Sequence, residues 1–163
     1  MEPRSGCPIN AAVEVLGDRW SLLILRDVIF SDRRYFRVLL TGSIEGIASN
    51  ILADRLVRLV DAGILTRGTG ARGQRVRYSL TEAGIKTLPI IFALGNWGMH
   101  WRPGSAELRS RQQLMDDEGP AFLEELMEEL RARHLGTPPK PHGGRGPLER
   151  LELATYNSTL EQS

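Results

Sequence analysis

The sequence predicts a mainly α-helical fold with one small β-hairpin and a helical extension at its C-terminal end. Three features of the apolar pattern lead to this fold class. Apolar residues recur three and four positions apart up to Ala62, at every second position over residues 76–80, and again at helical spacing beyond Thr81. Strand side chains alternate between two faces, whereas helical ones return about every 3.6 residues, so each change of period marks a change of element.

The first three helices are predicted from their start and stop residues. Pro8 suits the first turn of a helix that ends at Gly17, and the apolar residues between them follow helical spacing. Asp18 then serves as the N-cap of a second helix within "DRWSLLILRDVIF". A short third helix within "SDRRYFRVLLTG" ends at Gly42.

A fourth amphipathic helix is predicted over residues 49–62, with its leucines on one face. The segments "ILTR" and "RVRYSL" then form an antiparallel hairpin whose tip covers residues 68–74. A short helix, a turn and a second helix followed directly by a hairpin is the winged helix-turn-helix arrangement.

The chain beyond the hairpin is again helical. Thr81 caps a helix that Pro89 kinks or restarts, because proline lacks the backbone donor that the helix interior needs, and this helix ends near Trp101. In the C-terminal part, "GPAFLEELMEELRARHLG" has Pro120 at its start and Gly136 at its stop. "TPPKPHGGRGP" has the composition of a linker, and "LERLELATY" is a candidate last short helix.

The net charge of +1 hides an uneven distribution of charge along the chain. Residues 1–104 carry 14 basic and 9 acidic residues, whereas residues 105–163 carry 7 basic and 11 acidic ones. A basic body suggests a polyanionic partner. We therefore predict two parts, a DNA-binding and dimerisation domain over residues 1–104 and an acidic helical extension over residues 105–163.

The sequence offers no enzyme motif. The three histidines are scattered, no pair has metal-ligand spacing, and neither a phosphate-binding loop nor a nucleophile motif is present, so we expect no cofactor and no metal site. Cys7 is the only cysteine, which excludes a disulfide within one chain. The polar N-terminus and the short, interrupted apolar run "LPIIFALGNWGMHW" predict a cytoplasmic protein without a membrane segment.

Three groups of residues are candidates for binding double-stranded DNA. The N-terminal residues of the helix over 49–62 are placed to meet base edges in the major groove, where Asn50 suits adenine and Asp54 suits the cytosine amino group. The hairpin carries clustered arginines, and a third cluster marks the start of the helix before the recognition helix. The groups are Ser49, Asn50, Ala53, Asp54 and Arg58; Arg67, Arg72, Arg75 and Arg77; and Arg33, Arg34 and Arg37.

The first two groups also have an ordinary structural interpretation. The polar side of an amphipathic helix can simply face water, and a glycine-rich arginine loop can be a solvated loop. Clustered like charges repel, however, so a hairpin that tolerates them favours a role in neutralising phosphates.

Four segments carry a resemblance to a known family. "CPINAAVEVLGDRWSLLILRDVIF", "RRYFRVLL", "LADRLVRLVDAGILTR" and "VRYSLTEAGIKTLPIIFALGNWG" resemble the HxlR family of bacterial transcription regulators, winged-helix proteins related to the MarR group. The resemblance covers residues 6–101 and implies a homodimer on a pseudo-palindromic operator. We expect this regulator to act as a repressor. The chain departs from the family at Ala48, where a serine usually caps the recognition helix; Ser49 is the substitute cap in this sequence.

The resemblance also suggests how the protein is switched and how it dimerises. Cys7 aligns with the cysteine that several members use to sense electrophiles or disulfide stress; the alternatives are an inert cysteine and a regulator switched by a small-molecule effector. The helix over residues 81–101 is expected to form the dimer interface together with the first helix, through Ile91, Gly95, Gly98 and Trp101. Packing of these residues within one chain is the competing interpretation.

The helix that follows Pro120 has an apolar stripe that must be buried against something. Its members are Phe122, Leu126, Met127 and Leu130. Packing on the dimer is the favoured explanation, and covering an effector pocket or docking another protein are the others. If the stripe docks another protein, the chain has an alternative function as a winged-helix protein-interaction module that acts through its C-terminal extension.

Overall fold

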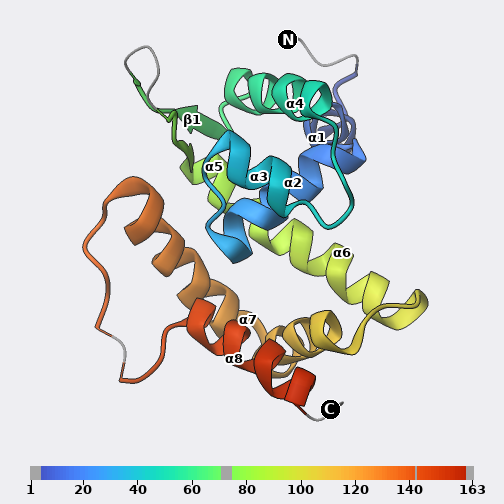
Figure 1. The fold of residues 1–163 in the computed structure, drawn as a ribbon, viewed down its shortest axis with the longest axis vertical. Coiled ribbons are helices and arrows are strands. Elements are labelled where there is room, and N and C mark those ends of the chain that lie inside the picture. Colours follow the sequence, from blue (N-terminus) through green and yellow to red (C-terminus); the bar gives the residue numbers. More distant parts are fainter. Residues whose placement is uncertain (1–4, 71–74, 142, 161–163) are drawn as a thin grey trace. The chain divides into compact units, whose positions relative to one another are not determined.

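The structure is a computed structural model that describes residues 5–70, 75–141 and 143–160. The chain divides into two compact units, Met1–Gly84 and Ile85–Ser163, and each is described by itself. Figure 1 shows the order of elements along the chain, from blue at the N-terminus to red at the C-terminus. The predicted functional boundary after residue 104 lies elsewhere and remains a prediction.

The first unit has the predicted mainly α-helical fold with a small antiparallel sheet. Its elements are α1 (Pro8–Leu16), α2 (Arg19–Ser31), α3 (Phe36–Gly42), α4 (Ser49–Asp61), β1 (Leu65–Arg67) and β2 (Tyr78–Leu80). The two strands pair with Leu65 opposite Leu80 and Arg67 opposite Tyr78. A short helix, α5 (Glu82–Ile85), ends at the boundary between the units.

The predicted caps of α2 and α5 are confirmed. The Asp18 carboxylate accepts hydrogen bonds from the backbone amides of Trp20 at 3.0 Å and Ser21 at 3.1 Å, which satisfies two amides that have no partner inside α2. The Thr81 hydroxyl likewise accepts from the Gly84 amide at 3.1 Å.

The core of the first unit lies between α2, α4 and the hairpin. The side chains that close it are almost fully buried: Leu25, Val28, Ile29, Leu52, Leu56, Leu59, Leu65 and Leu80. The leucines of α4 share one face, as the spacing predicts, because positions three and four apart lie on the same side of a helix. The opposite side of α4 is therefore left to solvent.

The second unit contains α6 (Leu88–Trp101), α7 (Ala106–Leu135) and α8 (Pro147–Leu160). Pro89 sits in the first turn of α6, so the helix restarts there as predicted and ends at Trp101. α7 is sharply bent at Gly119, where φ is 69° and ψ is −155°, and the predicted helix over residues 120–135 is its second arm. Its first arm begins after Ser105 and is a helix that the sequence reasoning missed.

The apolar stripe of α7 is covered within the same chain. α8 lies beside α7 in the second unit (Figure 1), and Leu148 and Leu151 of α8 are buried. Phe122, Leu126, Met127 and Leu130 are buried as well. The expectation that this stripe packs on a partner chain is therefore wrong, because the segment predicted as a short final helix returns along α7 and covers it.

Candidate nucleic-acid interface

The solvent side of α4 carries all five residues of this helix that were predicted to bind DNA. Ser49, Asn50, Ala53, Asp54 and Arg58 are exposed. Asn50 lies in the first turn of the helix, where a recognition helix meets base edges. The predicted cap is not Ser49, however, because Ala48 occupies the N-cap position and provides no side-chain hydrogen bond.

Asp54 is already engaged with two arginines on its own helix. Its carboxylate accepts from Arg55, and its Oδ2 lies 3.0 Å from Nε of Arg58. Arg55 also donates from Nε to Asp18 at 2.8 Å, which ties α4 to the start of α2. Asp54 therefore has to exchange a partner before it accepts from a cytosine amino group.

This ion-pair chain shifts two pKa values. The hydrogen bond with Asp18 holds the pKa of Arg55 above its usual value. Burial by itself raises the pKa of Asp18, but the hydrogen bonds from Ser21 and Arg55 outweigh burial and bring this pKa below its usual value. Both groups are therefore charged at neutral pH, and their contact anchors α4 to the start of α2.

A second network fixes the loop that leads into α4. Arg26 of α2 donates to both carboxylate oxygens of Glu45, at 2.5 and 2.9 Å, and to Asp27 at 2.8 and 2.9 Å. These hydrogen bonds lower the pKa of Glu45. Glu45 belongs to the loop between α3 and α4, so the network sets the path by which the chain enters the recognition helix.

The three arginines predicted to contact phosphates have different environments. Arg33 and Arg34 precede α3, whereas Arg37 lies within it and is exposed. Arg33 donates to Asp27 at 3.0 Å and to the carbonyl of Gly42. Of the three, Arg37 is the one presented to solvent.

The predicted phosphate contact does not hold for Arg34. Its residue surface is 3% exposed, and its guanidinium donates from Nε to the carbonyl of Tyr78 at 3.1 Å and from Nη2 to the hydroxyl of Ser79. A buried guanidinium with these partners cannot reach a phosphate without breaking them.

The hairpin presents its described arginines to solvent. Arg67, Arg75 and Arg77 are exposed, whereas Leu80 is fully buried. The alternation predicted for "RVRYSL" is therefore found at these positions. Arg72 belongs to the predicted wing but lies outside the described residues.

A hollow of about 670 Å³ lies between α3 and the hairpin. Arg37 of α3 and Arg67 and Arg75 of the hairpin line it, together with the rings of Tyr35, Phe36 and Tyr78. A second hollow, of about 420 Å³, shares Phe36, Arg67 and Tyr78 and extends along α4. Fork-shaped guanidinium groups around a concave surface suit phosphate oxygens.

Exposed apolar side chains mark two candidate surfaces for self-association. On α1, Ile9 is 73% exposed and Val13 is also exposed. On α6, Trp101 is 69% and Trp97 54% exposed, and Ile90 and Leu94 are exposed too. Large apolar side chains spaced along one helix face are unusual for a surface that meets only water.

The other residues predicted for the dimer interface are less accessible. Ile91, Gly95 and Gly98 are half-buried. A Cβ at Gly95 would lie 2.2 Å from Oε1 of Gln112 in the same chain, so the close approach at Gly95 is made by α7. Packing within one chain was the competing interpretation from the sequence, and it holds for Gly95, which is therefore removed from the candidate dimer interface. Beside Gly98 no heavy atom lies within 4 Å of such a Cβ in the described structure.

Cys7 is exposed and occupies the N-cap position of α1, directly before Pro8. Its backbone amide donates to the hydroxyl of Ser5 at 3.4 Å. The thiol is therefore accessible to reagents in solution, which a sensing role requires.

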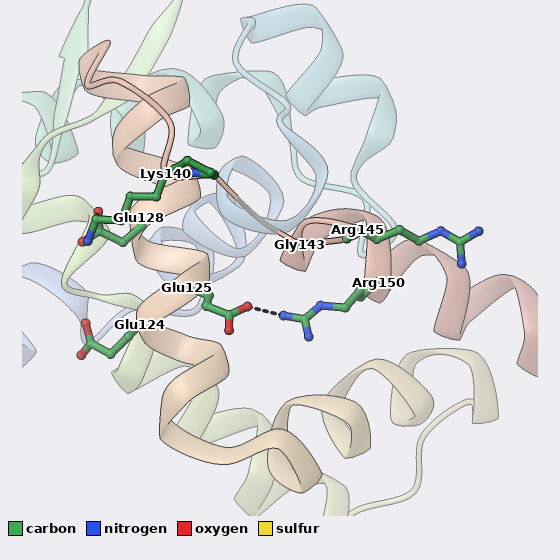
Figure 2. A pocket seen from close by; sticks show the side chains of 9 residues that line it. Glu124, Glu125, Glu128, Lys140, Gly143, Arg145 and Arg150 are labelled. Carbon is green, nitrogen blue, oxygen red and sulfur yellow. Dashed lines mark hydrogen bonds and ion pairs between the residues drawn. The ribbon is translucent and has the colours of Figure 1, made fainter.

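A hollow in the second unit was not expected from the sequence. It measures about 700 Å³ and lies between α7, the segment over residues 140–145 and α8 (Figure 2). Opposite charges in its wall pair with each other, Arg150 with Glu125 at 2.5 Å and Lys140 with Glu128 at 3.2 Å. These ion pairs close the C-terminal segment onto α7, so we assign the hollow a structural role.

Two kinds of feature are absent from residues 5–70, 75–141 and 143–160. Within them, no three or more His, Cys, Asp or Glu side chains gather as a metal site would require. None of the helices there combines the length and the apolar character needed to cross a membrane.

Comparison with known proteins places this geometry among regulators. The sequence pattern of the HxlR-like helix-turn-helix family matches residues 15–106. An uncharacterised helix-turn-helix-type transcriptional regulator of Mycobacterium bovis, Mb3122, is 31% identical over 141 residues, which cover 83% of this chain and 87% of the relative. A regulator of the same description from Synechocystis, sll1512, is 33% identical over 96 residues, covering 58% of this chain and 70% of the relative.

Solved structures show the same fold. The crystal structure of PA1607, described as a proposed transcription factor, aligns with a TM-score of 0.56 and 32% identity over 63% of this chain and 70% of that one. A MarR-family protein of Porphyromonas gingivalis W83 aligns with a TM-score of 0.50 and 30% identity, covering 61% and 96%. The redox regulator HypR in its reduced form aligns with a TM-score of 0.50 and 25% identity, covering 56% and 90%.

Proposed function

Because the chain belongs to the HxlR-like helix-turn-helix family of transcriptional regulators, we propose that it is a homodimeric repressor that binds a pseudo-palindromic operator in the cytoplasm. It acts as a DNA-binding regulator and not as an enzyme. The observation that carries the proposal is the arrangement of the first unit, in which the exposed side of α4 and the arginine-lined hollow between α3 and the hairpin belong to one compact body.

The chemistry of these side chains suits duplex DNA. The amide of Asn50 forms paired hydrogen bonds with adenine in the major groove, and the small side chain of Ala53 lets the helix approach closely. Arg37, Arg67, Arg75 and Arg77 neutralise phosphates beside the groove. Base contacts then supply sequence preference, and the arginines supply most of the affinity and its salt dependence.

The dimer is supported by the exposed apolar faces of α1 and α6. Tryptophans such as Trp97 and Trp101 each bury on the order of 150–250 Å² when covered, so their exposure makes a self-complementary surface favourable. A two-fold dimer also presents two recognition helices at the spacing of operator half-sites.

Replacing Asn50 with alanine removes one paired base contact from each half-site, and it is expected to reduce affinity for the preferred DNA site by roughly 30- to 25,000-fold, since each such contact contributes about 1–3 kcal/mol of discrimination. Affinity for random duplex DNA should stay within about twofold, because phosphate contacts dominate nonspecific binding. Fluorescence anisotropy at fixed salt measures both, with a site selected by the native protein from a random pool.

The matched control is Asn157→Ala, which removes an exposed asparagine from α8 and should change neither affinity. Equal losses on the selected site and on random DNA in the Asn50 variant would argue against base reading by this residue.

The proposed switch is Cys7. Its exposed thiol is accessible, and the structural relative HypR is described as a redox regulator. Diamide is expected to release the native protein from DNA, because two Cys7 thiols of the dimer lose two protons and two electrons to diamide and form an intersubunit disulfide. Cys7→Ser should stay bound, and a non-reducing gel should show the cross-linked dimer for the native protein alone. Equal responses of both proteins to diamide would exclude sensing by the Cys7 thiol.

The alternative function, an interaction module acting through the C-terminal extension, receives less support. The apolar stripe that would dock a partner protein is buried against α8, as described above.

A further inference from the structure

The turn before α3 adds a second hydrogen-bonded edge to the hairpin. On one edge, β2 pairs with β1, and the Gly68 amide donates to the carbonyl of Arg77 at 2.8 Å. On the other edge, Tyr35 forms an antiparallel bridge with Arg77, and the Tyr78 amide donates to the carbonyl of Arg34 at 2.8 Å. The start of the hairpin's second strand is therefore held from both sides.

The side chain of Arg34 reinforces the same edge. Its guanidinium donates to the carbonyl of Tyr78 and to the hydroxyl of Ser79, and Nη1 lies 3.8 Å from Oδ1 of Asp32. The backbone and side chain of one residue thus bind two successive residues of β2. A charged group buried to this degree is retained only where its donors have partners, and here these partners belong to the wing strand.

The two strands of the wing are short. β1 and β2 are three residues long each, and a two-stranded ribbon of that size is marginal by itself. Arg75 and Arg77 are exposed and close to the point where the chain enters β2. Like charges so close together favour splaying of the ribbon, so an anchor at its base decides where these arginines point.

We propose that Arg34 is a positioning residue for DNA binding: it fixes the wing strand to the turn before α3 and so sets where Arg75 and Arg77 meet the phosphates. The inference rests on the proposed function, because it assigns a role within the same DNA interface. Arg34 itself makes no contact with DNA in this assignment.

The first test needs no DNA. In Arg34→Met, the amide hydrogens of Gly68 and Tyr78 should exchange at least about tenfold faster relative to the amide of Leu56 in α4, because the wing opens locally. Arg34→Lys, which keeps a donor and the charge, should restore part of the protection. Arg131→Met is the matched control, since it removes an ion-paired arginine with a largely covered side chain from α7 of the second unit. Unchanged relative exchange in Arg34→Met would overturn the inference.

The second test is a double-mutant cycle measured by salt-dependent DNA binding. In the native background, Arg75→Ala with Arg77→Ala should lower affinity and flatten the salt dependence. In the Arg34→Met background the same double substitution should lower DNA affinity by less than about twofold, because arginines that are out of position contribute little to binding. In the Arg131→Met background the same double substitution should keep its full effect on affinity and on the salt slope. A merely structural arginine would leave the cycle additive.

If Arg34→Met does not fold, the same double-mutant cycle is measured in the Ser79→Ala and Arg34→Lys backgrounds. Ser79→Ala removes one acceptor of the guanidinium without changing the charge, and it should give a smaller loss of the same kind. If Arg75→Ala with Arg77→Ala lowers affinity as much in these backgrounds as in the native one, the role of Arg34 is overturned and the proposed function stands. If the native protein does not bind duplex DNA in dilute salt, the proposed function is overturned as well.

Discussion

Replacing Arg75 and Arg77 together with alanine is expected to weaken DNA binding of the dimer roughly 100- to 10,000-fold near 0.1 M salt and to reduce the slope of log K against log salt by about four. Each arginine that neutralises a phosphate releases about one counterion, and the dimer loses two arginines from each subunit, so about four units of salt dependence are lost. Both side chains are exposed on the hairpin, so the fold should be unaffected.

A salt titration by fluorescence anisotropy measures this effect on selected and on random DNA, and both should weaken to a similar extent. The matched control is Arg133→Ala with Arg145→Ala, which makes the same change in net charge on exposed arginines of the second unit. This control should shift affinity by less than about threefold through long-range electrostatics. An unchanged slope in the wing variant would remove the hairpin from the DNA interface.

Replacing Trp97 and Trp101 together with glutamate is expected to convert the protein to a monomer and to lower affinity for the operator at least about 100-fold. Two negative charges placed in an apolar interface cannot be solvated once it closes, so association fails. Each subunit must then bind its half-site alone and loses the high effective concentration that the dimer provides.

Sedimentation equilibrium measures the mass, and thermal unfolding checks that the variant is folded, since both tryptophans are exposed within the chain. Tyr156→Glu is the matched control, because it changes an exposed aromatic residue on α8 and should leave the dimer intact. A native protein that is already monomeric would contradict the dimer, and a variant that stays dimeric would move the interface away from this face of α6.

Two predictions, the phosphate contact of Arg34 and the place of Gly95 in the dimer interface, failed for the same reason. Arg33, Arg34 and Arg37 are alike in local sequence terms, yet Arg34 is buried because a strand more than forty positions later passes beside it. Gly95 is suited to close approach wherever it lies, and its actual neighbour, Gln112, belongs to a helix that the sequence reasoning missed. The residue types at these arginine and glycine positions indicated which contacts they could make, but not which segment of the chain would pack against them.

The sequence by itself determined the order of the elements up to α6, the caps of α2 and α5, and the exposed side of α4. Those features depend on contacts within a few residues, such as the carboxylate of Asp18 with the next turn and the leucines of α4 at positions three and four apart. The tertiary structure alone decided which arginines face solvent, that α8 covers the stripe of α7, and that Arg34 binds the wing strand. Those outcomes depend on which distant segments pack together. The periodicity of apolar residues can be read from the sequence, whereas the burial of a side chain depends on the segments that pack around it in the folded protein.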